Sequence, residues 1–177
     1  MRAGLIRILQ DAHAGELAAA YAYRGHARSL RRPSRQAARA EVLRIEEAEW
    51  HHRAEVAALL GELGARPRWP REILMGAIGR CFGALCFVGG WFAPMYAAGQ
   101  LEGTNIVQYA DAGDAARRLG LDAAVVRIEA MGVEECRHEQ WFGDQIRAHW
   151  LLAPTRRVFG WTPPEPAPAI VDEPTAT

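Results

Sequence analysis

Two of the six histidines in the 177-residue sequence follow a glutamate by three positions. On an α-helix, positions i and i+3 lie on one face, so the carboxylate and the imidazole of such a motif can converge on one point. Each Glu-x-x-His motif is itself preceded, 33 positions earlier, by another glutamate. The two sets, related by a shift of 86 positions, are Glu16, Glu49 and His52 in the first and Glu102, Glu135 and His138 in the second.

Each set fits an antiparallel pair of helices, in which facing residues lie at equal distances from the turn. The midpoint of the first set is Arg32-Pro33, and a proline disfavours helix at the residue before it. The midpoint of the second set is Arg118-Leu119, beside Gly120, and glycine suits the end of a helix. We therefore predict two hairpins that pack into a four-helix bundle, with four carboxylates and two imidazoles at mid-height.

Such a cluster requires cations. Four carboxylates in an apolar core would repel one another and lose their hydration, whereas two divalent cations would neutralise them. Carboxylates are hard ligands, and imidazole suits iron. The set matches the known ligand pattern of ferritin-like di-iron or di-manganese carboxylate bundles. We predict a site for two Fe ions, with manganese as an alternative. If the glutamates were instead ordinary solvated residues on helix surfaces, their repeated spacing would be a coincidence.

Tyr23 and Tyr109 obey the same shift, and each follows the first glutamate of its set by seven residues, or two helical turns. Both would lie within one to two turns of the metals. There they could orient ligands or pass an electron, so we regard them as candidate catalytic residues. The alternative is that each is an ordinary buried tyrosine.

The rest of the sequence is typical of an all-α protein, because Ala, Leu, Arg and Glu dominate and β-branched alternation is absent. Helices are expected over residues 3–29, 34–63, 71–88, a segment ending near 119, and 121–150. The expected fold is a ferritin-like four-helix bundle of two repeated hairpins with an extra apolar helix between them. Residues 1–161 would form this domain, and the proline-rich residues 162–177 a disordered tail.

Residues 81–99 carry no charged side chain over 19 positions, which is nearly enough to cross a bilayer. Three interpretations remain open: a membrane span, a buried core helix, or an apolar surface facing a membrane interface or a substrate. A span would put the first set of ligands on one side of the membrane and the second set on the other. One metal site could not then form, so an interfacial position fits the site and a span does not.

Composition limits partners and compartment. Positive and negative side chains cancel, so the sequence offers no basic excess for binding nucleic acid. The three cysteines form no CxxC pair and favour a reducing compartment. No apolar run near the N-terminus is long enough for a signal peptide. We expect a cytoplasmic protein, with peripheral contact to the inner face of the membrane and homo-oligomer formation both left open.

Other polar residues near the motifs are assigned lesser roles. Glu46 and Glu47 are expected to face solvent, and Leu43 to be buried. His51 has Arg137 as its counterpart under the shift, so it is expected at the surface or beside the ligands. His13 lies one helical turn before Glu16 and could contact this ligand without binding the metal itself. Three aspartates could hydrogen-bond a metal-binding histidine: Asp11, Asp111 and Asp144.

Several segments of the chain resemble the demethoxyubiquinone hydroxylase family, membrane-associated di-iron monooxygenases of ubiquinone biosynthesis. The segments are DAHAGELAAAYAY (11–23), EEAEWHH (46–52), ARPRWPREILMGAIGRCFGAL (65–85), GQLEGTNIVQY (99–109) and VEECRHEQWF (133–142). The resemblance implies that the six residues of the two sets bind the metals. It also implies a lipophilic quinone-like substrate, O2 as oxidant, and NADH or a quinol as reductant. Gln108 stands where the family has a histidine associated with electron delivery, so the donor is left open.

We therefore expect a di-iron monooxygenase that hydroxylates a lipophilic quinone or phenolic ring with O2. One alternative is a rubrerythrin-like peroxidase, although the sequence has no CxxC…CxxC module. The other is a non-enzymatic, ferritin-like iron-binding protein, which would form a large hollow oligomer.

Overall fold

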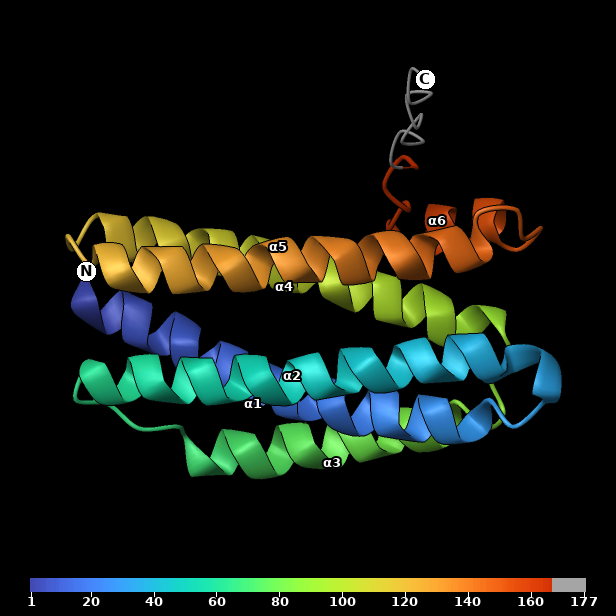
Figure 1. Ribbon diagram of the computed structural model, residues 1–177, viewed down its shortest axis with the longest axis horizontal. Helices are drawn as coiled ribbons and strands as arrows, with labels where there is room; N and C mark the ends of the chain where they lie inside the picture. Colours follow the sequence, from blue (N-terminus) through green and yellow to red (C-terminus); the bar gives the residue numbers. More distant parts are fainter. Residues whose placement is uncertain (167–177) are drawn as a thin grey trace, which may run out of the picture.

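The computed structural model describes residues 1–166, and every regular element among them is helical. The elements are α1 (Arg2–Ser29), the 3-10 turn η1 (Pro33–Arg35), α2 (Gln36–Glu62), α3 (Trp69–Leu85), α4 (Phe92–Arg117), α5 (Asp122–Ile146) and α6 (Leu152–Phe159). Figure 1 shows α1 and α2 as one antiparallel hairpin and α4 and α5 as a second hairpin packed on it. The expected ferritin-like bundle of two hairpins is confirmed.

Two glycines, Gly64 and Gly120, follow the helix ends that were expected near residues 63 and 119. Gly64 has φ 61° and Gly120 has φ 70°, a region that side chains with a Cβ rarely adopt. Beyond α2, the amide of Gly64 donates to Gly61 and that of Ala65 to Leu60, which is the hydrogen-bond pattern of a Schellman cap. The same pattern follows α4. These caps fix the lengths of the helices and thereby the register of the site.

The last long helix ends earlier than predicted, at Ile146 rather than near residue 150. Side chains take over the hydrogen bonds there: the Trp91 indole donates to the carbonyl of Gln145 at 3.3 Å, and the His149 ring accepts from the amide of Leu151 at 3.2 Å. His149 also stacks on Phe92, with ring centroids 4.7 Å apart. The chain therefore turns and forms α6, which the sequence analysis did not anticipate.

The apolar helix α3 lies outside the four-helix core, against α1 (Figure 1). Its contact face is made of Gly76, Gly79 and Gly83, which are buried. A Cβ at Gly79 would overlap the backbone of Ala18, so only glycine permits this approach. The uncharged segment 81–99 is therefore not one helix: its first residues end α3 on this outer layer, and its last residues begin α4, where Phe92, Met95 and Tyr96 are buried in the core. No helix among the described residues is long and apolar enough to cross a membrane.

Two apolar clusters fill the bundle at its opposite ends and leave the polar residues between them. One cluster joins the start of α1 to the end of α2, and its largest buried members are Leu5, Leu9, Leu59, Leu60, Tyr109, Ile128 and Met131. The other joins the end of α1 to the start of α2, with Tyr23, Leu30, Ile45, Phe92, Met95, Phe142 and Ile146. Burial of apolar surface, worth roughly 25 cal/mol per Å², holds the helices together on both sides of the site.

Beyond α6 the chain packs against the second hairpin. The Trp161 ring lies on Gly99, its indole N–H donates to Glu139 at 2.7 Å, and its carbonyl accepts from Tyr96 at 2.9 Å. Arg147 donates to the carbonyl of Pro164 at 2.7 Å. The packed part of the chain therefore extends past the boundary expected at residue 161. Residues 167–177 of the expected tail lie outside the described residues.

Candidate metal centre

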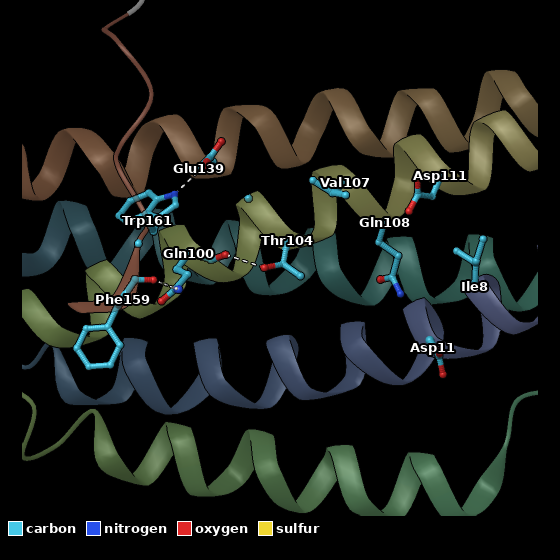
Figure 2. A pocket seen from close by; sticks show the side chains of 12 residues that line it. Ile8, Asp11, Gln100, Thr104, Val107, Gln108, Asp111, Glu139, Phe159 and Trp161 are labelled. Carbon is cyan, nitrogen blue, oxygen red and sulfur yellow. Dashed lines mark hydrogen bonds between the residues drawn. The ribbon is translucent and has the colours of Figure 1, made fainter. Parts of the chain in front are cut away.

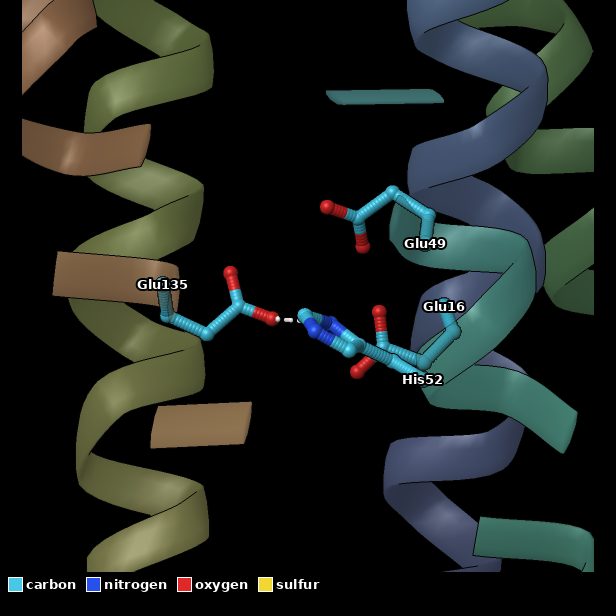
Figure 3. A group of neighbouring side chains, drawn as sticks. All are labelled: Glu16, Glu49, His52 and Glu135. Atoms are coloured by element: carbon cyan, nitrogen blue, oxygen red, sulfur yellow. Dashed lines mark ion pairs between the residues drawn. The ribbon is translucent and has the colours of Figure 1, made fainter. Parts of the chain in front are cut away.

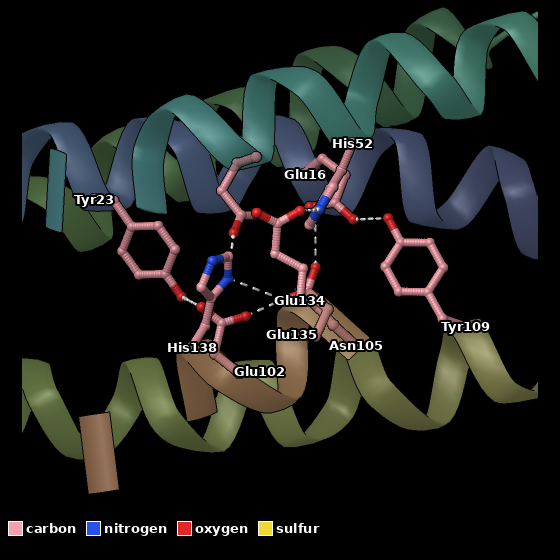
Figure 4. Close-up of polar contacts among 10 residues, drawn as sticks. Glu16, Tyr23, His52, Glu102, Asn105, Tyr109, Glu134, Glu135 and His138 are labelled. Carbon is pink, nitrogen blue, oxygen red and sulfur yellow. Dashed lines mark hydrogen bonds and ion pairs between the residues drawn. The ribbon is translucent and has the colours of Figure 1, made fainter. Parts of the chain in front are cut away.

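The six predicted ligands converge at the middle of the bundle from four helices (Figure 4). α1 and α4 each supply one glutamate, and α2 and α5 each supply a Glu-x-x-His motif. All six are buried, and the most exposed, His138, retains only 8% of its surface. The prediction that these residues come together, made from a repeat in the sequence, is correct.

The donor atoms fall into two overlapping groups, and within each group they lie within 4.8 Å of one another. The first group is Glu16, Glu49, His52 and Glu135, and the second is Glu49, Glu102, Glu135 and His138. Figure 3 shows the first, with Glu135 approaching from α5 and the other three from the first hairpin. Glu49 and Glu135 belong to both groups, as is expected of carboxylates that bridge two cations.

Most of these donor atoms have no hydrogen-bond partner, although they are buried. No hydrogen bond reaches either oxygen of Glu49, either oxygen of Glu135, or the Nδ1 atom of either histidine. The His52 Nδ1 lies 3.0 Å from an oxygen of Glu135, and the His138 Nδ1 lies 3.6 Å from oxygens of Glu49 and Glu135. Buried polar atoms without partners are costly. Oxygen and imidazole donors aimed at common points therefore fit two divalent cations.

Without a metal, the electrostatics of the cluster favour protons on several of its groups. Burial and the charge of Glu135 raise the pKa of Glu49 and of Glu102 well above the usual range. Glu135 goes the other way: burial opposes the shift, but contacts with His138 and His52 lower its pKa to about 2. Burial alone would lower the pKa of His52, yet Glu135 raises it to about 9. Metal binding must displace these protons.

The two tyrosines contact the ligands in a crossed arrangement (Figure 4). Tyr23 of the first hairpin donates its hydroxyl hydrogen bond to Glu102 of the second, and Tyr109 of the second donates to Glu16 of the first. Burial raises the pKa of both hydroxyls well above the usual value, so both remain neutral donors. Each tyrosine therefore orients one terminal carboxylate and joins the two hairpins.

A comparison with protein-family models matches residues 3–140 to the family described as "Ubiquinone biosynthesis protein COQ7". The match covers all six ligands and both tyrosines. The chain belongs to this family. A search of curated proteins and a search of solved structures found no match. The COQ7 family places the chain in ubiquinone biosynthesis, as the resemblance of the sequence segments implied.

The sequence analysis missed two residues that contact the candidate ligands of this COQ7-family site: Glu134, and Asn105, whose buried amide donates to Glu102 at 3.4 Å. Glu134 lies beside the ligand Glu135 in the chain, and its carboxylate is 3.0 Å from the Nε2 of His52. A carboxylate on one ring nitrogen fixes the tautomer and leaves the other nitrogen, here Nδ1, as the candidate donor to a cation. The repeat gave no signal for it, because the counterpart of Glu134 under the 86-residue shift is Ala48.

Three of the four residues considered for such a supporting role have other partners. Asp11 pairs with Arg71 at 2.7 Å, and Asp144 with Arg147 at 2.7 Å. His13 is buried, but its Nδ1 lies 2.8 Å from Glu72 of α3. Asp111 lines a surface hollow on α4. Among the described residues, none of the four makes the hydrogen bond to a candidate ligand that the sequence had left open.

In the stretch EEAEWHH (46–52), the exposure of one residue, Glu46, differs from the prediction. Glu47 and His51 are exposed, as expected, and His51 contributes nothing to the cluster. Glu46, expected to face solvent, is buried and accepts a hydrogen bond from Arg24 at 2.7 Å. Leu43, expected to be buried, is 42% exposed. Because α2 packs on both α1 and α5, it buries a wider face than the one that carries Glu49 and His52. The Arg24 guanidinium offsets the free-energy cost of burying the Glu46 carboxylate.

Gln108 lies away from the ligands, in a hollow of about 660 Å³ between the outer side of α4, α1 and the chain beyond α6 (Figure 2). The hollow is lined by Ile8, Asp11, Gln100, Gly103, Thr104, Val107, Gln108, Asp111, Glu139, Phe159, Gly160 and Trp161. None of the six ligands is among them, so this hollow does not open directly onto the metal donors.

Proposed function

We propose that this chain is a di-iron monooxygenase that hydroxylates the ring of a lipophilic quinone or phenol with O2. The observation that carries the proposal is the pair of donor groups sharing Glu49 and Glu135, in a chain of a ubiquinone-biosynthesis family. Manganese remains the alternative metal. Reducing equivalents would come from NADH or a quinol.

The chain's own residues prepare the site for this chemistry. The shared carboxylates would hold two iron ions side by side, and such ions supply the reductive activation of O2. Glu16 and Glu102 would each complete one ion's ligand set, with Tyr109 and Tyr23 fixing their orientation through hydrogen bonds. Apolar clusters on both sides exclude bulk water, which protects a reactive oxidant from side reactions.

The exposed apolar surface of α3 supports the proposal that the substrate is lipophilic. Although its glycine face lies against α1, large apolar side chains point outward over its length and into the following turn: Trp69, Ile73, Leu74, Phe82, Leu85, Phe87 and Val88, each at least half exposed. An exposed apolar patch of this kind marks a contact surface. We propose that α3 docks on the membrane that holds the substrate, with the bundle outside the bilayer.

The activity is tested by aerobic turnover of a demethoxyquinone by iron-loaded protein with NADH or a chemical reductant. Incorporation of one oxygen atom from labelled O2 into the product is expected, with loss of activity in Glu49→Ala. Full iron loading without any hydroxylated product would overturn the proposal. Rapid consumption of H2O2 under the same conditions would instead favour a peroxidase.

The docking surface is tested separately by flotation with vesicles of phosphatidylcholine and phosphatidylglycerol. Phe82→Glu and Leu85→Glu should lose vesicle binding. Val126→Glu is a matched control, because Val126 is 67% exposed but lies on α5. Equal binding by all three variants would show that α3 is not the contact surface.

A further inference from the structure

A line of aromatic rings joins the metal centre to the surface on one side of the bundle. The Tyr23 hydroxyl donates to Glu102, and the Tyr23 ring stacks on Phe142 with centroids 5.5 Å apart. Phe142 in turn meets the Trp141 ring edge-on, with centroids 5.0 Å apart. Tyr23 and Phe142 are buried, whereas Trp141 is partly exposed. The line therefore runs without interruption from a metal-binding carboxylate to the solvent boundary.

The internal repeat provides a comparison within the molecule. Tyr109 is the counterpart of Tyr23, but the counterparts of Phe142 and Trp141 under the 86-residue shift are Val56 and Glu55. Among the described residues, the ring contact of Tyr109 is with His52. Val56 is fully buried, so an aliphatic side chain fills the equivalent space in the other half. Packing around these tyrosines does not require a line of aromatic rings. Among the described residues, such a line runs to the surface from Tyr23 and not from Tyr109.

We propose that Tyr23, Phe142 and Trp141 form an exit path for oxidising equivalents when O2 reacts at the centre without a ring substrate. The proposal rests on the proposed monooxygenase function. Tyrosine and tryptophan are among the side chains most readily oxidised by one electron, and the intervening phenyl ring shortens the gap that the electron must cross. The path would protect the buried ligands, which cannot be replaced once oxidised.

The electrons and protons balance as follows. Tyr23 gives one electron to the oxidised centre, and its hydroxyl proton moves along the hydrogen bond to Glu102. Trp141 then gives one electron to the Tyr23 radical through Phe142, and the proton returns from Glu102 to the tyrosine oxygen. Trp141 loses its indole proton to water. A thiol in solution restores it by donating a hydrogen atom, or, without a thiol, Trp141 is permanently oxidised by O2.

The position of permanent oxidation tests the path. Iron-loaded full-length protein would be cycled with reductant and O2 in the absence of quinone and of thiol, with catalase present to remove free peroxide. Peptide mass spectrometry would then measure oxidation at each tryptophan. Trp150 and Trp69 are reference sites, because they are 78% and 71% exposed and would react first with any oxidant in bulk solution. We expect Trp141 to be oxidised several-fold more than either.

Two variants assign the route. Tyr23→Phe and Phe142→Leu should each lower Trp141 oxidation several-fold. Phe92→Leu, the same kind of substitution in the same apolar cluster but outside the line, should leave it unchanged at equal iron content. Trapping by rapid freezing should give a tryptophan radical signal in the wild type that Trp141→Phe lacks. Greater oxidation of Trp150 than Trp141, or Trp141 oxidation unaffected by both Tyr23→Phe and Phe142→Leu, would overturn the path. Quinone hydroxylation that persists with such a result would leave the proposed function standing.

Discussion

The crossed hydrogen bonds from Tyr23 and Tyr109 give each carboxylate at the ends of the ligand set a partner on the opposite hairpin. A glutamate side chain has several rotatable bonds, and a fixed donor removes part of that freedom before metal binds. Because each tyrosine belongs to the opposite hairpin, the carboxylates take their orientation only when the two hairpins pack together. At the residue scale, the site is thus assembled by the fold.

The two adjacent histidines of α2 should differ sharply on substitution. His52 is fully buried among the donors, whereas His51 is exposed. His52→Ala should lose at least half of the bound iron, while His51→Ala should retain all of it. Iron content per chain, measured after anaerobic loading and desalting, checks the expectation. Equal iron loss in both variants would contradict the assignment of ligands.

Glu134 should matter although it does not bind metal. Its carboxylate lies 3.0 Å from His52 Nε2, and removal of such a partner typically lowers metal affinity by about 10- to 100-fold. We expect Glu134→Ala to show a loss of this size in a competition titration with a metal chelator. Glu47→Ala, an exposed glutamate on α2, serves as the control. An affinity equal to that of the control would exclude the supporting role.

At the element scale, the position of α3 depends on glycines. A Cβ at Gly25 would overlap Gly83, and one at Gly79 would overlap Ala18, so the α1 and α3 backbones are in direct contact. This contact leaves the larger apolar side chains of α3 no place except the outer surface. The same glycines that attach the helix to the bundle therefore determine which face it presents outward.

Gly79→Ala should accordingly destabilise the protein by about 1–3 kcal/mol, the usual cost of overpacking a tight contact. Gly61→Ala is a matched control in α2, where a Cβ would meet nothing within 4 Å. There the substitution should be neutral or stabilising by about 0.5–1 kcal/mol. Urea unfolding of metal-free protein measures both. A neutral Gly79→Ala would mean that α3 is not held by this contact.

The elements also show what the sequence could and could not reveal. Pro33 and Gly120 act locally in the two hairpin turns, so these turns and the register of the hairpins followed from the sequence. Gly64 likewise ends α2 locally. The early end of α5 depends on Trp91 and His149, whose partners are distant or follow the helix. Only the folded chain brings those side chains to the place where they compete with helical hydrogen bonds.

The same division applies to the site. The 86-residue repeat located the six residues that converge in the bundle, because both hairpins must satisfy the same geometry. It could not reveal Glu134, which has no counterpart, nor the buried pair of Glu46 and Arg24, which depends on how α1 packs against α2. It placed Tyr23 and Tyr109 correctly but could not show that each contacts a ligand of the other half.

At the scale of the whole molecule, stability and metal binding are linked through protons. In the metal-free fold, the pKa of His52 rises from 6.5 to about 9, and burial raises those of Glu49 and Glu102. The folded state therefore binds these protons more tightly than the unfolded state, so stability falls as pH rises through this range.

We expect metal-free protein to lose stability of the order of 3 kcal/mol between pH 6.5 and 9, since one pKa unit corresponds to about 1.4 kcal/mol. Metal-loaded protein should not follow this trend, because cations replace the protons, and loading should release protons into a weakly buffered solution. Denaturant unfolding across the pH range and a dye titration measure the two effects. A metal-free form that grows more stable toward pH 9 would contradict the protonation pattern.

The most direct test of the central claim is the number of irons that the buried cluster binds. Protein loaded anaerobically with Fe(II) and desalted should hold about two irons per chain, as in other carboxylate bundles of this type. Because Glu49 belongs to both donor groups, Glu49→Ala should lose both ions, whereas His51→Ala should keep both. Fewer than one iron per wild-type chain, or unchanged loading in Glu49→Ala, would contradict a two-metal centre bridged by shared carboxylates.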